Sequence, residues 1–204
     1  MGRRSDHSRD EIREMALTAA QDILERDGPE AVTSRAIAQA IGYTAGTLYN
    51  IFSDLDDLKL HVNARSLDLL RAQLAEARKS AAACVDVQPI DVVMALARGQ
   101  LRFIQQHPML WQTLFRYTLP DGRTLPDWFR LKVADTIREL ELAIEPVFTD
   151  AEARQRHARM LWAAFYGICE IASTSRMKLI GLDEVEAMTR DLVSASLDRA
   201  AAGQ

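Results

Sequence analysis

Apolar residues recur at intervals of three and four positions along most of this 204-residue chain, which is the period of an amphipathic α-helix. No segment alternates apolar and polar residues as a half-buried strand would, and no internal repeat or low-complexity stretch appears. The pattern predicts an all-α fold of about nine helices, which we expect near residues 8–27, 33–41, 44–52, 54–82, 90–106, 109–117, 126–144, 149–180 and 183–201.

Start and stop signals mark several of these helix ends. Ser8 precedes Glu11 by three residues, and Thr149 precedes Glu152 by the same interval, so both pairs have the spacing of a capping box. Gly28 and the proline after it form a typical stop for the first helix. These signals predict where the helices begin and end, in addition to where their apolar faces lie.

The stretch from residue 33 to residue 52 combines two short helical patterns around a glycine. It reads TSRAIAQAIGYTAGTLYNIF. Thr33 and Thr44 stand where each short helix would begin and can cap it, and Gly42 suits the left-handed residue that ends the first of them. This is the sequence form of a helix-turn-helix, whose second helix enters the major groove of DNA. The rest of the chain would then supply a dimer interface or a sensor.

Composition and charge are those of an ordinary globular protein. Hydrophobic residues make up 48% and charged residues 26%, and no apolar run approaches the ~20 residues of a membrane span. The first ten residues lack the apolar stretch of a secretory signal, and Cys84 and Cys169 have no metal-ligand spacing. We therefore expect a soluble, cytoplasmic protein. The net charge of −4 argues against non-specific coating of nucleic acid but not against sequence-specific binding.

The sequence contains no pattern that is typical of a catalytic site. There is no paired nucleophile and base, no metal-ligand spacing and no phosphate-binding loop. The four histidines, His7, His61, His107 and His157, have no sequence neighbours that form a known catalytic constellation. We expect no enzymatic activity, no catalytic residue, no bound metal and no cofactor.

Ten residues of the stretch 33–52 carry a resemblance to a known family. They are Thr33, Ile37, Ala38, Gly42, Thr44, Gly46, Thr47, Leu48, Tyr49 and Phe52. On these residues, in their place behind one amphipathic helix, the chain resembles the tetracycline-repressor-like (TetR) family of bacterial transcription regulators. The segment Trp162 to Gly167 is similar to a Trp…His-Gly motif in one branch of the family, with Tyr166 at the usual histidine position. The resemblance implies an arm and DNA-binding domain over 1–53 and an effector-binding and dimerisation domain over 54–204.

The resemblance and the physics of DNA docking together select candidate DNA-binding residues. Thr33 and Thr44 begin helices whose free backbone N–H groups can face phosphates, with plain helix capping as the alternative role. Thr47 and Tyr49 match family positions that touch the DNA backbone, and the amide of Asn50 can pair with an adenine edge. The full set is Thr33, Arg35, Thr44, Ala45, Gly46, Thr47, Tyr49 and Asn50.

The start of the fourth expected helix departs from the family pattern. Leu55 stands where members often have a phosphate-contacting lysine, and Asp54, Asp56 and Asp57 surround it. Ala45 likewise replaces a frequent DNA-facing residue. Because carboxylates that faced DNA would repel its phosphates, we hypothesise weak intrinsic affinity or greater reliance on an N-terminal arginine arm.

Aromatic residues concentrate between positions 107 and 167, where the resemblance implies a pocket for a small hydrophobic or aromatic effector. An ordinary core is the alternative for each single ring. A buried Glu170 would select a cationic or hydrogen-bond-donating effector, and a buried Arg116 an anionic one. The candidate ligand-binding residues are His107, Trp111, Phe115, Arg116, Trp128, Phe129, Trp162, Phe165, Tyr166 and Glu170.

The resemblance also implies a two-fold dimer through the helices near residues 150–180 and 183–201, with burial inside one subunit as the alternative. We predict a homodimeric repressor that leaves a near-palindromic operator in double-stranded DNA when its effector binds. Two alternatives stay open. One is a helix-turn-helix regulator that a protein partner controls without a small-molecule ligand. The other is a helical interaction module with weakened DNA binding.

Overall fold

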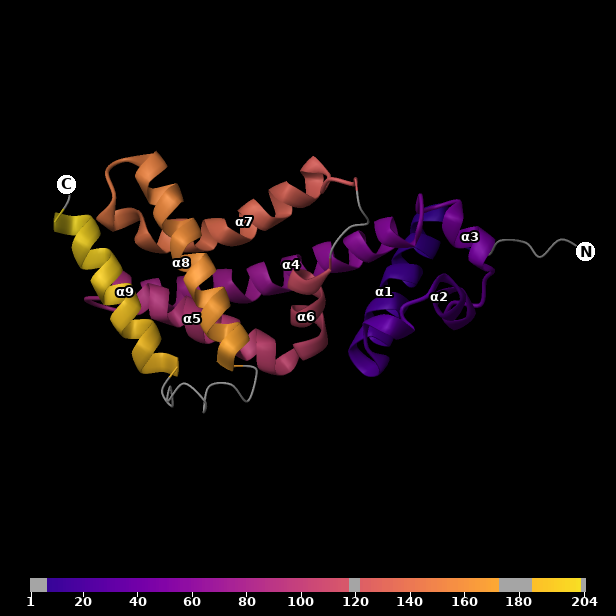
Figure 1. Ribbon diagram of the computed structural model, residues 1–204, viewed down its shortest axis with the longest axis horizontal. Coiled ribbons are helices and arrows are strands. Elements are labelled where there is room, and N and C mark those ends of the chain that lie inside the picture. The colour runs from indigo at the N-terminus through magenta and orange to yellow at the C-terminus, as the bar shows by residue number, and fades with distance from the viewer. Residues whose placement is uncertain (1–6, 118–121, 173–184, 203–204) are drawn as a thin grey trace, which may run out of the picture. The chain divides into compact units, whose positions relative to one another are not determined.

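The computed structural model describes residues 7–117, 122–172 and 185–202, and within these ranges its regular structure is entirely helical (Figure 1). This agrees with the predicted all-α class. The described part contains nine α-helices and two short 3-10 helices. The side chains of residues 115, 116, 172 and 200–202 lie outside the description.

The first half of the chain carries a long helix, two short helices and a second long helix. Gly28, with φ of +85°, ends the first helix at the predicted position. The elements in chain order are α1 (Arg9–Asp27), η1 (Pro29–Ala31), α2 (Ser34–Ala40), α3 (Ala45–Tyr49) and α4 (Leu55–Ala82).

The second half consists of five further α-helices with short connections. Their bounds follow the predicted segments, although the part of the eighth expected helix beyond residue 172 lies outside the described residues. The elements are α5 (Pro89–Gln106), α6 (Pro108–Arg116), α7 (Asp127–Ile144), η2 (Glu145–Val147), α8 (Ala151–Ala172) and α9 (Val185–Ala202).

The chain divides into two compact units, and α4 contributes to both. The first unit comprises residues 1–68 and 106–130, and in it α1 packs against α2 and α6. The second comprises residues 69–105 and 131–204, and in it α8 packs against α9. Each unit buries its own apolar side chains, including Leu24, Ile37 and Phe52 in the first and Met94 and Leu161 in the second. Burial of such side chains is the main stabilising contribution in each unit.

Two predicted helix starts had different outcomes. The capping box of Ser8 and Glu11 is confirmed, because each side chain accepts a hydrogen bond from the other residue's backbone N–H. The capping box predicted for Thr149 and Glu152 is wrong. The carboxylate of Asp150 accepts from the N–H groups of Glu152 and Ala153, at 3.3 and 2.8 Å. Two adjacent residues can both cap, and the charged carboxylate, which takes two donors at once, is the stronger acceptor.

Candidate nucleic-acid interface

A tight turn joins α2 to α3 and sets the direction of the second helix. Gly42 has φ of +75°, a conformation that residues with a Cβ atom adopt only with strain. The backbone N–H of Tyr43 donates to the carbonyl of Ala38 over 2.9 Å, which closes the turn. The glycine predicted to end the first short helix therefore has the left-handed conformation that the prediction required.

Threonine hydroxyls cap both helices of this motif, as the sequence predicts. The Thr33 hydroxyl accepts from the backbone N–H of Ala36 at 3.2 Å, at the start of α2. The Thr44 hydroxyl accepts from the backbone N–H of Thr47 at 3.4 Å, and lies 3.1 Å from the Thr47 hydroxyl. Thr33 and Thr44 are exposed and Thr47 is half-buried. Capping is thus confirmed, whereas contact of these groups with phosphates stays a prediction.

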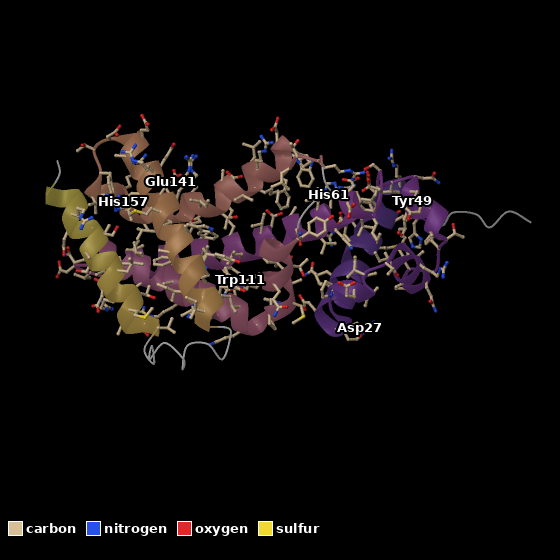
Figure 2. All side chains as sticks on the ribbon, viewed as in Figure 1. Asp27, Tyr49, His61, Trp111, Glu141 and His157 are labelled. Carbon is tan, nitrogen blue, oxygen red and sulfur yellow. The ribbon has the colours of Figure 1, made fainter. Side chains whose placement is uncertain are left out.

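Tyr49 is the largest exposed side chain of α3 and has a partner that the sequence did not reveal. Its side chain is 52% exposed, and its hydroxyl lies 2.9 Å from the hydroxyl of Ser34 at the start of α2 (Figure 2). This bond ties the end of α3 to the beginning of α2. Position 34 directly follows the predicted cap Thr33, but no sequence rule pairs a serine there with a ring fifteen residues later.

The other predicted DNA-binding residues lie around these. Arg35, Gly46 and Asn50 are exposed and Ala45 is half-buried, whereas Leu48 is the buried residue of α3. One apolar side chain therefore anchors a helix whose other residues remain accessible. An α-helix with an accessible polar surface of this kind is what major-groove binding requires.

His7, two residues before α1, is connected to the turn of the motif. Nδ1 of His7 lies 2.9 Å from the Tyr43 hydroxyl, and the two rings meet edge to face at 6.2 Å. The predicted arm residues Arg3 and Arg4 lie outside the described residues. The described chain therefore starts beside the turn between α2 and α3.

The acidic turn, which we define as Asp54, Asp56 and Asp57, begins α4. Asp54 accepts from the backbone N–H of Asp57 at 2.8 Å, and Asp57 accepts from the backbone N–H of Ser53 at 2.9 Å. These bonds satisfy backbone donors that every helix start leaves open. The predicted helix start at Asp54 is therefore confirmed.

Two side chains from the segment between α6 and α7 contact the acidic turn. Nη1 of Arg123 lies 2.7 Å from Asp54 and 3.9 Å from Asp56, and the Tyr117 hydroxyl donates to Asp56 over 2.6 Å. The backbone bond from Asp57 and then the Arg123 guanidinium lower the pKa of Asp54. Burial and the Asp56 carboxylate raise the pKa of Tyr117, which keeps its proton on the donor. Each carboxylate of the acidic turn therefore has a partner inside the first unit.

A ring cluster lies one turn further along α4. The Trp128 indole stacks on the His61 imidazole with centroids 4.5 Å apart and planes 8° apart, and Phe52 packs at 6.0 Å on the same imidazole (Figure 2). The Arg13 guanidinium lies 5.0 Å from the centre of the Phe52 ring. Burial, followed by the charge of Arg13, lowers the pKa of His61, and Asp57 opposes this shift. His61 is therefore neutral at neutral pH.

The predicted effector residues divide between the two units. His107, Trp111, Trp128 and Phe129 belong to the first, and the side chains of Phe115 and Arg116 lie outside the description. Nδ1 of His107 lies 3.3 Å from the Glu25 carboxylate, Trp111 is fully buried, and Phe129 meets Trp128 edge to face at 5.7 Å. Each contact gives its side chain a structural role in the first unit, and effector binding by these residues stays a prediction.

The remaining predicted effector residues lie on α8 in the second unit. Phe165 is buried, whereas Trp162, Tyr166 and Glu170 are half-buried. Phe165 lines a cavity of about 10 Å³ together with Gln100 and Cys169, and Nε2 of Gln100 has no hydrogen-bond partner among the described residues. That volume holds about one water molecule and no aromatic ring. Burial raises the pKa of the Cys169 thiol to about 12, so it stays protonated.

An apolar groove of about 400 Å³ lies along α8 and α9. Met160 and Leu192 line it and are 52% and 37% exposed, which is high for side chains of their size. His157 lies at the same groove, where its Nε2 atom is 2.6 Å from the Ser196 hydroxyl (Figure 2). By contrast, Leu161 and Val193 are buried within the single chain. The exposed apolar surface of these two helices is therefore the part available to a partner.

Several other classes of site are absent from the described part of the chain. Over those residues no group of three or more His, Cys, Asp or Glu side chains is placed to hold a metal ion. Cys84, which is exposed, and Cys169 are both free thiols. None of the described helices has the length and apolar character that crossing a membrane requires.

The helical fold, the capped helix-turn-helix and its accessible second helix define a DNA-binding regulator of the helix-turn-helix class. Residues 16–62 match the family described as "Bacterial regulatory proteins, tetR family", and residues 93–196 match "Tetracyclin repressor-like, C-terminal domain". The chain belongs to the TetR family of transcriptional regulators. The predicted family is thereby confirmed, and its members are DNA-binding regulators and not enzymes, whereas the Trp…His-Gly branch stays a prediction.

Individual relatives agree with this assignment. The chain is 26% identical over 178 residues to the "Uncharacterized HTH-type transcriptional regulator Rv0681" of Mycobacterium tuberculosis, which covers 87% of this chain and 76% of that protein. A solved protein of unknown function from Rhodococcus sp. RHA1 has a similar fold, with a TM-score of 0.67 and 19% identity. The match covers 99% of this chain and 98% of that chain. RolR, solved with resorcinol, has a TM-score of 0.63, 16% identity and coverage of 94% of both chains. The two solved structures support the fold alone.

Proposed function

We propose that this regulator is a homodimeric repressor that leaves a near-palindromic operator when a small hydrophobic or aromatic effector binds its C-terminal part. The observation that carries the proposal is the accessible α3, with Tyr49 held by Ser34 and both helix starts capped by exposed threonines. Hydroxyls and helix starts of this kind position a protein on phosphates, while exposed side chains of the second helix reach the bases.

The residues of α3 divide between these two roles. Thr44, Thr47 and Tyr49 contact the phosphate backbone and fix the register, because hydroxyl groups bond phosphate oxygens without reading sequence. Asn50, which is exposed at the end of α3, pairs with an adenine edge. Arg35, exposed in α2, adds a phosphate contact that depends on salt.

The dimer forms through the apolar groove along α8 and α9. Met160 and Leu192 leave apolar surface exposed there, and exposed patches of this kind support association. A two-fold dimer places two copies of α3 on half-sites about 34–36 Å apart, which is one turn of DNA. A near-palindromic operator matches that symmetry.

Effector control is supported by the aromatic residues of the C-terminal part and by a ligand in a protein of the same fold. Trp162 and Tyr166 are half-buried on α8, and RolR was solved with resorcinol. The 10 Å³ cavity beside Phe165 is too small for such a ring. An effector that binds beside Phe165 therefore requires a second conformation with a larger cavity there, and it shifts the dimer towards that conformation.

Binding to DNA is tested first, by gel shift on fragments of the promoter region of the protein's own gene, at low and high salt. We expect a discrete, salt-sensitive, dimer-sized complex on one near-palindrome. Asn50→Ala should lose sequence preference, whereas Gln105→Ala, an exposed amide in the other unit, should not. An unchanged preference in Asn50→Ala would contradict the assigned role of this residue.

Effector binding is tested by thermal unfolding in a panel of small phenols and aromatic cations, with resorcinol as the first probe. A true ligand raises the unfolding temperature and releases the protein from the operator fragment. DNA binding without any stabilising compound favours the regulator controlled by a protein partner. Absence of any specific complex favours the interaction module with weakened DNA binding.

A further inference from the structure

The acidic turn carries three carboxylates close to the helix-turn-helix, and this is unfavourable for a protein that binds phosphates. Asp54 follows Tyr49, the last residue of α3, by five positions, which span at most about 17 Å of extended chain. The backbone N–H of Phe52 donates to the carbonyl of Leu48, which shortens the connection. Salt screens such charges over a length of about 10 Å, so their effect on the phosphates of bound DNA is strongest at low salt.

The structure provides each of these carboxylates with a partner, and two partners come from a distant segment. Asp57 is held by a backbone N–H, Asp54 by a backbone N–H and by Arg123, and Asp56 by the Tyr117 hydroxyl. Arg123 also lies 3.9 Å from Asp56, so one guanidinium is shared by two carboxylates. Its positive charge reduces the negative field of the acidic turn, and the hydroxyl fixes the direction of Asp56.

We propose that Arg123 and Tyr117 are affinity-determining residues for DNA that act through the acidic turn and do not contact DNA. Arg123 places a positive charge beside Asp54 and Asp56, on either side of Leu55, where the resemblance leads us to expect a phosphate-contacting lysine. The difference is that a lysine at position 55 would bind a phosphate, whereas Arg123 removes a repulsion. The proposal rests on DNA binding by the family, and it is independent of any effector.

The test compares Arg123→Ala with Arg130→Ala. Arg130 belongs to the same unit, pairs with Asp127 at 3.4 Å, and carries the same charge, so its removal changes net charge equally without unpairing the acidic turn. The probe is a fluorescein-labelled duplex that the wild-type protein selects from a random-sequence library, with binding followed by anisotropy at low and physiological salt. We expect Arg123→Ala to weaken binding roughly threefold to tenfold at low salt, and Arg130→Ala to change it less than about twofold.

A second substitution that restores DNA affinity distinguishes this mechanism from a direct contact between Arg123 and DNA. Asp54→Asn keeps a good helix cap and removes the charge that Arg123 had paired. Added to Arg123→Ala, it should recover most of the lost affinity. Arg123→Lys should retain most of the affinity, and Tyr117→Phe should lose a smaller part than Arg123→Ala. Circular dichroism of every variant confirms that the helices are intact.

Two results would overturn the proposal. Equal affinities of Arg123→Ala and Arg130→Ala would show that pairing of the acidic turn does not affect DNA binding. A loss in Arg123→Ala that Asp54→Asn does not recover would show that Arg123 contacts DNA or acts on the fold. Failure of the wild-type protein to select any duplex contradicts DNA binding itself, and a mixed-sequence duplex at low salt then still compares the same variants.

Discussion

Among the described residues, each unit contains an acid–arginine network in which a charged group has two partners, and the two networks differ in burial. In the second unit Glu139 of α7 is 7% exposed and accepts from Nε of Arg78 at 2.9 Å, with Arg71 at 3.8 Å. In the first unit Asp54 is 34% and Arg123 51% exposed. A buried charge depends on its partner because no water replaces it, whereas an exposed charge is solvated in either state. The exposed network of Asp54 and Arg123 is therefore expected to affect DNA binding, and the buried network of Glu139 and Arg78 to affect folding.

The largest effect is expected from breaking the buried network. Arg78→Met leaves Glu139 without its nearest partner, and we expect the free energy of unfolding to fall by about 2 kcal/mol, since Arg78 is still about one fifth exposed. Urea unfolding followed by circular dichroism measures it. Arg156→Ala, which breaks an exposed pair with Glu152 on α8, should leave the urea midpoint unchanged. Equal midpoints for Arg78→Met and the wild-type protein would contradict the role assigned to burial.

The next largest effect is expected on the affinity for DNA, without a change in stability. Tyr49→Phe removes the hydroxyl that bonds Ser34 and, by our proposal, a phosphate, so affinity should fall about fivefold, the equivalent of one hydrogen bond. Ser34→Ala leaves the Tyr49 hydroxyl in place and should weaken binding less than Tyr49→Phe does. Anisotropy titrations on the same duplex compare the two variants. A larger loss in Ser34→Ala would assign the main contact to the serine.

A pH-dependent effect is expected from His61, a partly buried titratable group of the first unit. Its pKa in the folded protein is lowered below the unfolded value of about 6.5, so the unfolded state binds more protons between the two values. Stability is therefore complete above about pH 6.5 and falls as the pH drops from there towards the folded-state pKa. His61→Phe should remove this part of the slope. Urea midpoints at closely spaced pH values measure it, and an unchanged slope in His61→Phe would disprove the assignment.

The smallest effect is the stability change in Arg123→Ala. The pair with Asp54 is largely solvated, so the urea midpoint should not change measurably, even where DNA affinity does. This result sharpens the difference between the two networks. A clear loss of stability would show that the exposed network also holds the segment between α6 and α7 on α4.

Structural features that depend only on neighbouring residues, such as helix caps, could be predicted from the sequence. Thr33 and Thr44 cap their helices as expected, because a cap needs only the residues of the next turn. The same rule led to the wrong cap for α8, where Thr149 and Asp150 compete and the carboxylate accepts the bonds. Local rules thus identify the helix but do not choose between two adjacent acceptors.

Contacts between distant segments could not be predicted. The acidic turn suggested repulsion of DNA, and nothing near it in the sequence indicated that Arg123 and Tyr117 would pair with it. The sequence predicts a place in a ligand pocket for Trp128, and no local rule indicates that it stacks on His61; its effector binding stays a prediction. Such pairs are set by how helices pack, and composition gives no measure of that.

The stacking of Trp128 on His61 also has an optical consequence. An excited indole loses its energy more readily to a protonated imidazole than to a neutral one, and the two rings are nearly parallel. The emission of Trp128, one of three tryptophans in the chain, therefore responds to the protonation of His61 and to any separation of the two rings. The protein thus carries its own fluorescent probe, Trp128 at the start of α7, which reports on His61 in the first turns of α4.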